Sequence, residues 1–313
     1  MYASLPRFLL RRFLTGILVL WGAVTVTFFA VSAAGDQVDA ILGPQAANLP
    51  GLRERVAAEY GLDRPLPVQY LDRLASLATG DFGRSYQRSQ PVTRLLGSQI
   101  LPTLQLALSA ALVGLLLALI ATVITAGRGR IVRTGTSVFE VLAVAVPPFW
   151  LGILLLSLFS FNLRWFPAFG SHGVSGLVLP TLALAIPISG VLAQVMRQEL
   201  ELVEGRPFVL SARARGQSRL GLLLRHTLRH ALLPATTMSA WVLGTLVGGA
   251  VLVEKVFSRP GLGTVLVNAV QHRDTPVVSA VVILAALIFV VANTLADTLY
   301  PVIDARLREA GRA

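Results

Sequence analysis

Two histidines lie four residues apart, at His226 and His230, a spacing that places both on one face of a helix. Zinc hydrolases combine such a pair with a glutamate that activates water. No Asp or Glu occurs between Glu204 and Glu254, so the pair lacks both a general base and a further ligand. The sequence therefore predicts neither a metal site nor a catalytic site at these histidines.

The sequence also lacks the motifs that bind or transfer phosphate groups. The chain has no Gly-x-x-x-x-Gly-Lys-Ser/Thr cradle, and the glycine-rich run 127–130 lacks the Lys and the hydroxyl that would reach phosphate and magnesium. The triplets at 81–83 and 272–274 spell two protein-kinase signatures, but in reverse order and without a glycine-rich loop or a strand lysine. Without any cysteine, thiol catalysis is excluded as well. We expect a protein that is not an enzyme and needs no cofactor.

The composition indicates a membrane protein. Of 313 residues, 54% are hydrophobic and 14% are charged, and the mean hydropathy is +0.70. Soluble domains carry about 25% charged residues. The net charge of +11 could serve nucleic acid or an anionic lipid surface, and the positions of the arginines relative to the apolar stretches favour lipid. No nucleic-acid partner is therefore expected.

Six uncharged stretches are long enough to cross a bilayer, which takes about 20 apolar residues. Because a backbone exposed to lipid must satisfy its own hydrogen bonds, these stretches are expected to be helices. The sequence predicts an all-α polytopic membrane protein with six transmembrane helices, at Phe13–Ala34, Ile100–Ala126, Val141–Asn162, Gly173–Met196, Ala231–Val253 and Thr275–Ala296.

The basic residues also predict the orientation. Segments 1–12, 127–140, 197–230 and 297–313 lie on one side of the six predicted spans and carry 16 of the 27 Lys and Arg residues. Positive loops stay in the cytoplasm, so both termini are predicted to be cytoplasmic in a bacterial inner membrane.

The predicted spans contain no ionisable residue. Glu140 and Asp297 lie at span edges, where we expect them to face the cytoplasmic interface. A proton relay or an ion-coupling site is therefore not predicted. If this chain moves a solute uphill, the energy must come from another subunit.

The loops define the domain organisation. We predict a cytoplasmic N-terminus with the first span (1–34), an external subdomain (35–99), a five-helix core (100–300) that includes a cytoplasmic loop (197–230), and a cytoplasmic tail (301–313). In the fifth span, Gly244 and Gly248 form a small-xxx-small face with Gly249 beside it. Such a face suits close helix packing, either within the monomer or at a subunit seam.

The cytoplasmic loop 197–230 has the most distinctive pattern. Pro207 suits the first turn of a helix, Gly216 the left-handed position that ends one, and Ser218 the cap of the next. The second helix is expected to run into the fifth span until Pro234. The pattern predicts a short helix, a glycine elbow and a second helix, an arrangement that could receive a soluble partner.

These residues resemble those of a known family. The loop sequence Ser211-Ala212-Arg213-Ala214-Arg215-Gly216, followed by Arg225-His226 and Leu232-Leu233-Pro234, resembles the permeases of dipeptide, oligopeptide and nickel ABC importers. Further matching motifs extend the resemblance over nearly the whole chain, at 60–65, 80–85, 101–104, 147–150, 248–251, 260–263, 273–274 and 299–306. Two positions depart from the family pattern: Leu210-Ser211-Ala212 replaces Glu-Ala-Ala, and Asp304-Ala305-Arg306 replaces Asp-Pro-Arg.

The resemblance implies a type I ABC importer permease fold and a mechanism. An external solute-binding protein would deliver a peptide to a pathway between this chain and a homologous permease, and two P-loop ATPases would drive transport. Segment 205–222 would be the coupling helix, with Ser211 to Gly216 against an ATPase. An external surface at Arg259, Pro260, Gly261, Gly263 and Asp274 would meet the binding protein. Nickel or haem as cargo, a passive channel and an ion-driven carrier remain alternatives.

Overall fold

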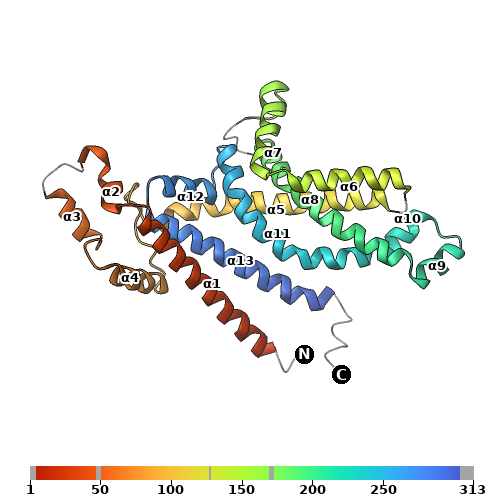
Figure 1. Ribbon diagram of the computed structural model, residues 1–313, viewed down its shortest axis with the longest axis horizontal. Coiled ribbons are helices and arrows are strands. Elements are labelled where there is room, and N and C mark those ends of the chain that lie inside the picture. The colour runs from red at the N-terminus through yellow and green to blue at the C-terminus, as the bar shows by residue number, and fades with distance from the viewer. Residues whose placement is uncertain (1–4, 47–50, 127, 169–172, 304–313) are drawn as a thin grey trace. The chain divides into compact units, whose positions relative to one another are not determined.

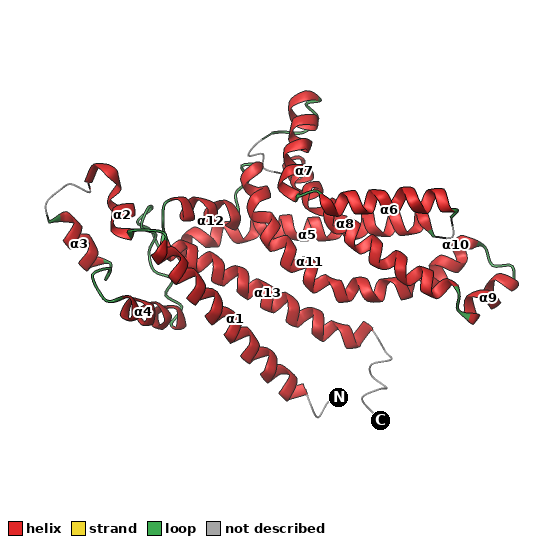
Figure 2. Cartoon of the chain, in the orientation of Figure 1, coloured by secondary structure: helices red, strands yellow, loops and turns green. Residues whose placement is uncertain are grey.

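The computed structural model describes residues 5–46, 51–126, 128–168 and 173–303. These residues are almost entirely helical, and Figure 2 shows helices and loops but no strand among them. An isolated bridge joins Arg84 and Pro91. The prediction of an all-α chain is confirmed for the described residues. The predicted tail, including Asp304-Ala305-Arg306, lies outside them from residue 304 onward.

The chain divides into two compact units. Of the described residues, one unit holds those within 104–259 and 291–303, and the other holds those within 5–103 and 260–290. The predicted external segment 35–99 therefore shares a unit with the first span and with residues from the sixth.

Among the described residues, the unit that begins at residue 5 is built from seven helices or parts of helices. They are α1 (Leu5–Ala33), α2 (Gln37–Ala46), α3 (Leu52–Glu59), α4 (Leu66–Ala78), the first part of α5 (Val92–Thr125), α12 (Leu262–Gln271) and the first part of α13 (Thr275–Ile303). Its buried cluster combines Val92 and Leu96 of α5 with Leu262 of α12 and Val278 of α13. Residues far apart in sequence thus share one core.

The other unit contains α6 (Arg130–Ala145), α7 (Pro148–Leu155), the π-helical segments η2 (Leu156–Asn162) and η3 (Leu223–Thr227), α8 (Ser175–Glu204), α9 (Pro207–Ala214), α10 (Arg219–Leu222) and α11 (Leu228–Val256). Helix α8 is central, because α6, α7 and α11 all pack against it (Figure 1). Leu184, Met196 and Leu246 lie in its buried core. The Ser109 and Thr181 hydroxyls are 2.8 Å apart and link α5 to α8.

Four described helices are long and apolar enough to cross a membrane: α1, α5, α8 and α13. The predicted third span is not one straight helix. Helix α6 begins at Arg130, eleven residues before the predicted start, and ends at Ala145, while α7 and η2 continue at an angle of 102°. Pro147 and Pro148 explain the break, because a proline disfavours helical geometry in the residue before it and cannot donate to the preceding turn. Together the two arms count as at most a fifth span.

Three further boundaries differ from the prediction. Helix α5 begins at Val92, and its 34 residues extend over about 50 Å, well beyond a hydrocarbon core of about 30 Å. Helix α12 lies between the predicted fifth and sixth spans, where no span was predicted. Helix α11 runs through Pro234, where the sequence predicted an end.

Candidate functional site

The predicted helix, elbow and second helix are present. Helix α9 begins at Pro207, whose missing N–H needs no partner at the first helical position. It ends before Gly216, which has φ of +75°. The Gly216 N–H donates to the Arg213 carbonyl at 2.9 Å, and the Gly221 N–H donates to Ser218 Oγ at 3.2 Å. Pro207, Gly216 and Ser218 therefore have the local conformations that the sequence predicted.

A small buried cluster fixes α9 in place. Val209 and Ala212 of α9 pack with Val203 of α8 and Leu222 of α10. The Phe208 ring also lies 5.7 Å from the His230 ring of α11. Because Ala212 is buried, it supports the helix and offers no surface to a partner.

The opposite side of α9 is exposed. Ser211, Arg213, Ala214, Arg215 and Gly216 are all exposed. Leu202 and Leu210 add apolar surface nearby, with 68% and 55% of their area exposed. The exposed surface of α9 is therefore basic and partly apolar.

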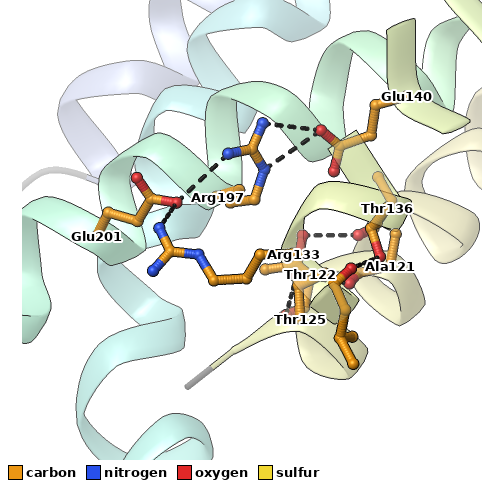
Figure 3. A network of polar contacts seen from close by, with 10 residues as sticks. Ala121, Thr122, Thr125, Arg133, Thr136, Glu140, Arg197 and Glu201 are labelled. Carbon is orange, nitrogen blue, oxygen red and sulfur yellow. Dashed lines mark hydrogen bonds and ion pairs between the residues drawn. The ribbon is translucent and has the colours of Figure 1, made fainter. Parts of the chain in front are cut away.

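A network of charged side chains joins α6 to the part of α8 that precedes α9. Arg197 donates from Nε and Nη2 to Glu140 Oε2 of α6, at 3.3 and 3.0 Å. It also reaches Glu201 at 3.3 Å, and Glu201 accepts from Arg133 of α6 at 2.5 Å (Figure 3). The order of the pairs along the two helices shows that α6 and α8 run antiparallel.

The position of Glu140 corrects an expectation. The sequence placed it at an exposed membrane edge, yet it lies within α6 with 1% of its area exposed. Its Oε1 is buried and accepts no hydrogen bond from any described residue. Gly190 of α8 permits this burial: a Cβ there would lie 2.8 Å from the Glu140 carbonyl oxygen. In the sequence, the one signal for the Glu140–Arg197 pair is an arginine directly after a predicted span.

The glycines of the fifth span occupy different environments. Gly249 faces α8, where a Cβ would lie 3.1 Å from Leu184 Cδ2. Gly248 is exposed, with open space around its Cα, and Gly244 is partly buried. Gly249 thus serves helix packing within the chain, whereas Gly248 is exposed.

The predicted external contact residues are also dissimilar. Gly261 immediately precedes α12 and Gly263 is buried within it. Pro260 is exposed and Arg259 is partly buried. Asp274 is 3% exposed, because its carboxylate accepts hydrogen bonds from the segment 85–87. The Asp274 carboxylate therefore holds segment 85–87 in place, and it is too buried to contact a partner directly.

Among the described residues, no group of three or more His, Cys, Asp or Glu side chains could hold a metal ion. The features that remain are apolar helices, an antiparallel helix pair joined by charges, and an exposed basic helix between two of them. This arrangement defines a helical membrane protein with an exposed basic surface at α9.

Comparison with known proteins specifies the class. The chain belongs to the family of binding-protein-dependent transport system inner membrane components, whose model matches residues 110–309. It is therefore a multi-pass inner-membrane permease component of such a transporter.

Three relatives illustrate the likeness. The glutathione transport system permease protein GsiC of Salmonella typhimurium strain LT2 is 36% identical over 291 residues, covering 91% of this chain and 93% of the relative. A protein of Brucella suis biovar 1, provisionally named a peptide permease, is 33% identical over 316 residues, covering 96% and 99%. One of Brucella abortus strain 2308, provisionally named a peptide transport system permease, is 35% identical over 310 residues, covering 96% and 98%.

Proposed function

We propose that this chain is a permease subunit of an ATP-binding-cassette importer for short peptides. Relatives named for peptide and glutathione transport, matched over at least nine-tenths of the chain, carry this proposal. They favour peptides over nickel or haem. A passive channel or an ion-driven carrier is less well supported, because the family depends on binding proteins.

The proposed assembly has an external binding protein, a second homologous permease and two P-loop ATPase subunits or domains. The chain would cross the membrane six times, with α6 and α7 as one bent crossing and α11 as the fifth. Both termini and α9 would lie in the cytoplasm, as the arginine distribution supports. In this arrangement α9 meets an ATPase, and the exposed Gly248 surface meets the second permease.

The geometry of α9 supports a role in coupling. Its buried face is anchored to α8 and α10, so a push on Arg213 or Arg215 would move those helices with it. The α6–α8 charge network then ties α8 to α6. We infer that ATPase movement at α9 reaches the membrane helices through α8.

Reconstitution tests this function. Proteoliposomes containing this chain, the second permease and the ATPases should accumulate a labelled dipeptide only when both the binding protein and ATP are present. Omitting either component is the matched control. Uptake by this chain alone, without ATP, would instead support a channel or an ion-driven carrier.

A further inference from the structure

A buried carboxylate shapes the turn at residues 85–90. Ser85 Oγ donates to Asp274 Oδ2 at 2.5 Å, and the N–H groups of Tyr86 and Gln87 donate to the same carboxylate at 3.2 and 3.3 Å. Ser85 Oγ in turn accepts from the Arg88 N–H at 3.0 Å. The Asp274 charge is thus matched by donors from one short segment.

The backbone of the turn closes on itself. The Ser85 N–H donates to the Gln90 carbonyl, and the Ser89 N–H donates to the Ser85 carbonyl, both at 3.0 Å. Ser89 has φ of +50°, a conformation that non-glycine residues seldom adopt and that the surrounding hydrogen bonds must support. A rigid turn therefore presents Arg88 at its tip.

The Arg88 side chain itself is exposed, and no ion pair or hydrogen bond to its guanidinium is found among the described residues. It lines two adjoining cavities of about 300 and 330 Å³. Both cavities also share Leu95 of α5 and Val265 and Asn268 of α12. We call the joined space, with these four shared residues, the Arg88 groove.

The chemistry of the groove suits an anion attached to a short polar chain. Arg94 adds a second guanidinium to one cavity, while Asp274, the acid in the other wall, is already bonded to three donors. Arginine binds carboxylates with two parallel hydrogen bonds. Gln87 and Gln90 line the cavities and carry amide groups of the kind that bind a peptide main chain. The Gln87 Nε2 also donates to the Ala40 carbonyl at 3.0 Å.

We propose that the Arg88 groove binds the terminal carboxylate of a short peptide, with Arg88 as the anchoring cation and Asp274 as a positioning residue. The inference rests on the proposed peptide cargo. Concave cavities of about 300 Å³ have the size of small-ligand sites, whereas protein partners usually need a broader surface. This favours a peptide end over an acidic side chain of the binding protein.

Protection of an introduced cysteine tests the proposal, since the chain has no cysteine of its own. Ser98→Cys places a thiol in the groove wall, and Ala58→Cys places an exposed one on α3 outside both cavities. In the full chain in nanodiscs, trialanine should slow maleimide labelling at position 98 but not at position 58. Trialanine amide, which lacks the carboxylate, should protect neither.

Substitution of the anchoring cation completes the test. Arg88→Gln should raise the half-protecting peptide concentration about tenfold or more, as expected for a charge-assisted hydrogen bond. Arg55→Gln removes another exposed arginine, on α3 and outside both cavities, and should change nothing. Equal protection by trialanine and its amide, or unchanged protection in Arg88→Gln, would overturn the proposal.

Import measured in parallel separates the two proposals. If wild-type proteoliposomes import peptide but trialanine does not protect position 98, the groove inference fails and the proposed function stands. If Arg88→Gln instead weakens binding-protein affinity without any peptide protection, the groove is a docking site and the inference is again wrong. Absence of wild-type import would contradict the proposed function itself.

Discussion

Glu140 carries the clearest energetic constraint at the scale of single residues. A carboxylate with 1% exposure is tolerated only when it is paired, and Arg197 provides the pair. Arg197 itself is 19% exposed and shares its charge with Glu201. The pair therefore joins α6 to α8 without leaving the arginine fully buried.

Removing the buried acid should destabilise the helix pair. Glu140→Gln is expected to cost about 1–3 kcal/mol, less than the roughly 3–5 kcal/mol of a fully buried pair, because Arg197 keeps Glu201 and some water. Glu201→Gln, in which a 39% exposed acid is lost, should cost below about 1 kcal/mol. Thermal unfolding midpoints in detergent would compare them. Equal midpoint shifts for the two variants would contradict the assigned burial.

Gly190 sets how closely α6 and α8 approach. A Cβ at this position would lie 2.8 Å from the Glu140 carbonyl oxygen and 3.0 Å from Val144 Cγ2. Gly190→Ala should therefore force the helices apart and lower stability by about 1–3 kcal/mol. Gly135→Ala is the matched control, since its Cβ meets nothing within 4 Å. It should be neutral or stabilise α6 by up to about 1 kcal/mol, and a similar loss in both variants would argue against the close approach.

At the scale of elements, α9 and its elbow give the sharpest expectation. Gly216 has φ of +75°, and a Cβ there would meet nothing within 4 Å. The cost of a substitution is therefore conformational, about 1 kcal/mol for Ala and more for a β-branched residue. Gly216→Val should change the elbow, weaken ATPase co-purification and lower import at a normal membrane level, and Gly216→Ala should do so less.

The other end of α9 offers a control for this prediction. Gly205 has φ of −84° and open space around it, so Gly205→Ala should leave ATPase binding unchanged. Full import by Gly216→Val at normal expression would mean that the elbow does not transmit movement between the subunits.

Local patterns predicted some elements and missed others for physical reasons. Pro207, Gly216 and Ser218 affect the backbone of their own neighbours in sequence, so the local conformations could be predicted without knowledge of the fold. The burial of Glu140 depends on Gly190 and Arg197, fifty residues or more away, and no local pattern reports such a pair. Helix α12 was missed because its ten residues are too short to span a membrane and lie between turn-forming residues.

The bend between α6 and α7 shows the same limit. The composition identified an apolar stretch that contains Pro147 and Pro148. Counting apolar residues shows that a stretch is long enough to cross the membrane, but it does not predict the angle between its two halves. The charged start of α6 was assigned to a loop because arginines are costly in a bilayer. In the structure Arg130 and Arg133 belong to the first turn of α6, and Arg133 pairs with Glu201 of α8.

At the scale of the whole molecule, the bent pair decides the topology. If α6 and α7 together cross the membrane once, three crossings separate Gln87 from Ser218, which then lie on opposite sides. If the pair is re-entrant and returns to the side from which it came, only α5 and α8 cross, and the two residues lie on the same side. The arginine distribution supports the first arrangement.

Single cysteines can distinguish the two arrangements, because the chain has none. Gln87→Cys, Pro167→Cys and Ser218→Cys each replace an exposed residue, and the second lies between η2 and α8. With one bent crossing, an impermeant maleimide should label positions 87 and 167 in intact cells and position 218 only after permeabilisation. Ala212→Cys, at a buried position of α9, should label in neither condition. Labelling of position 218 from outside, together with protection of position 167, would show that the pair is re-entrant and would place α9 on the outer face. Such a result would contradict the proposed ATPase contact, because α9 lies in the cytoplasm only if α6 and α7 together cross the membrane once.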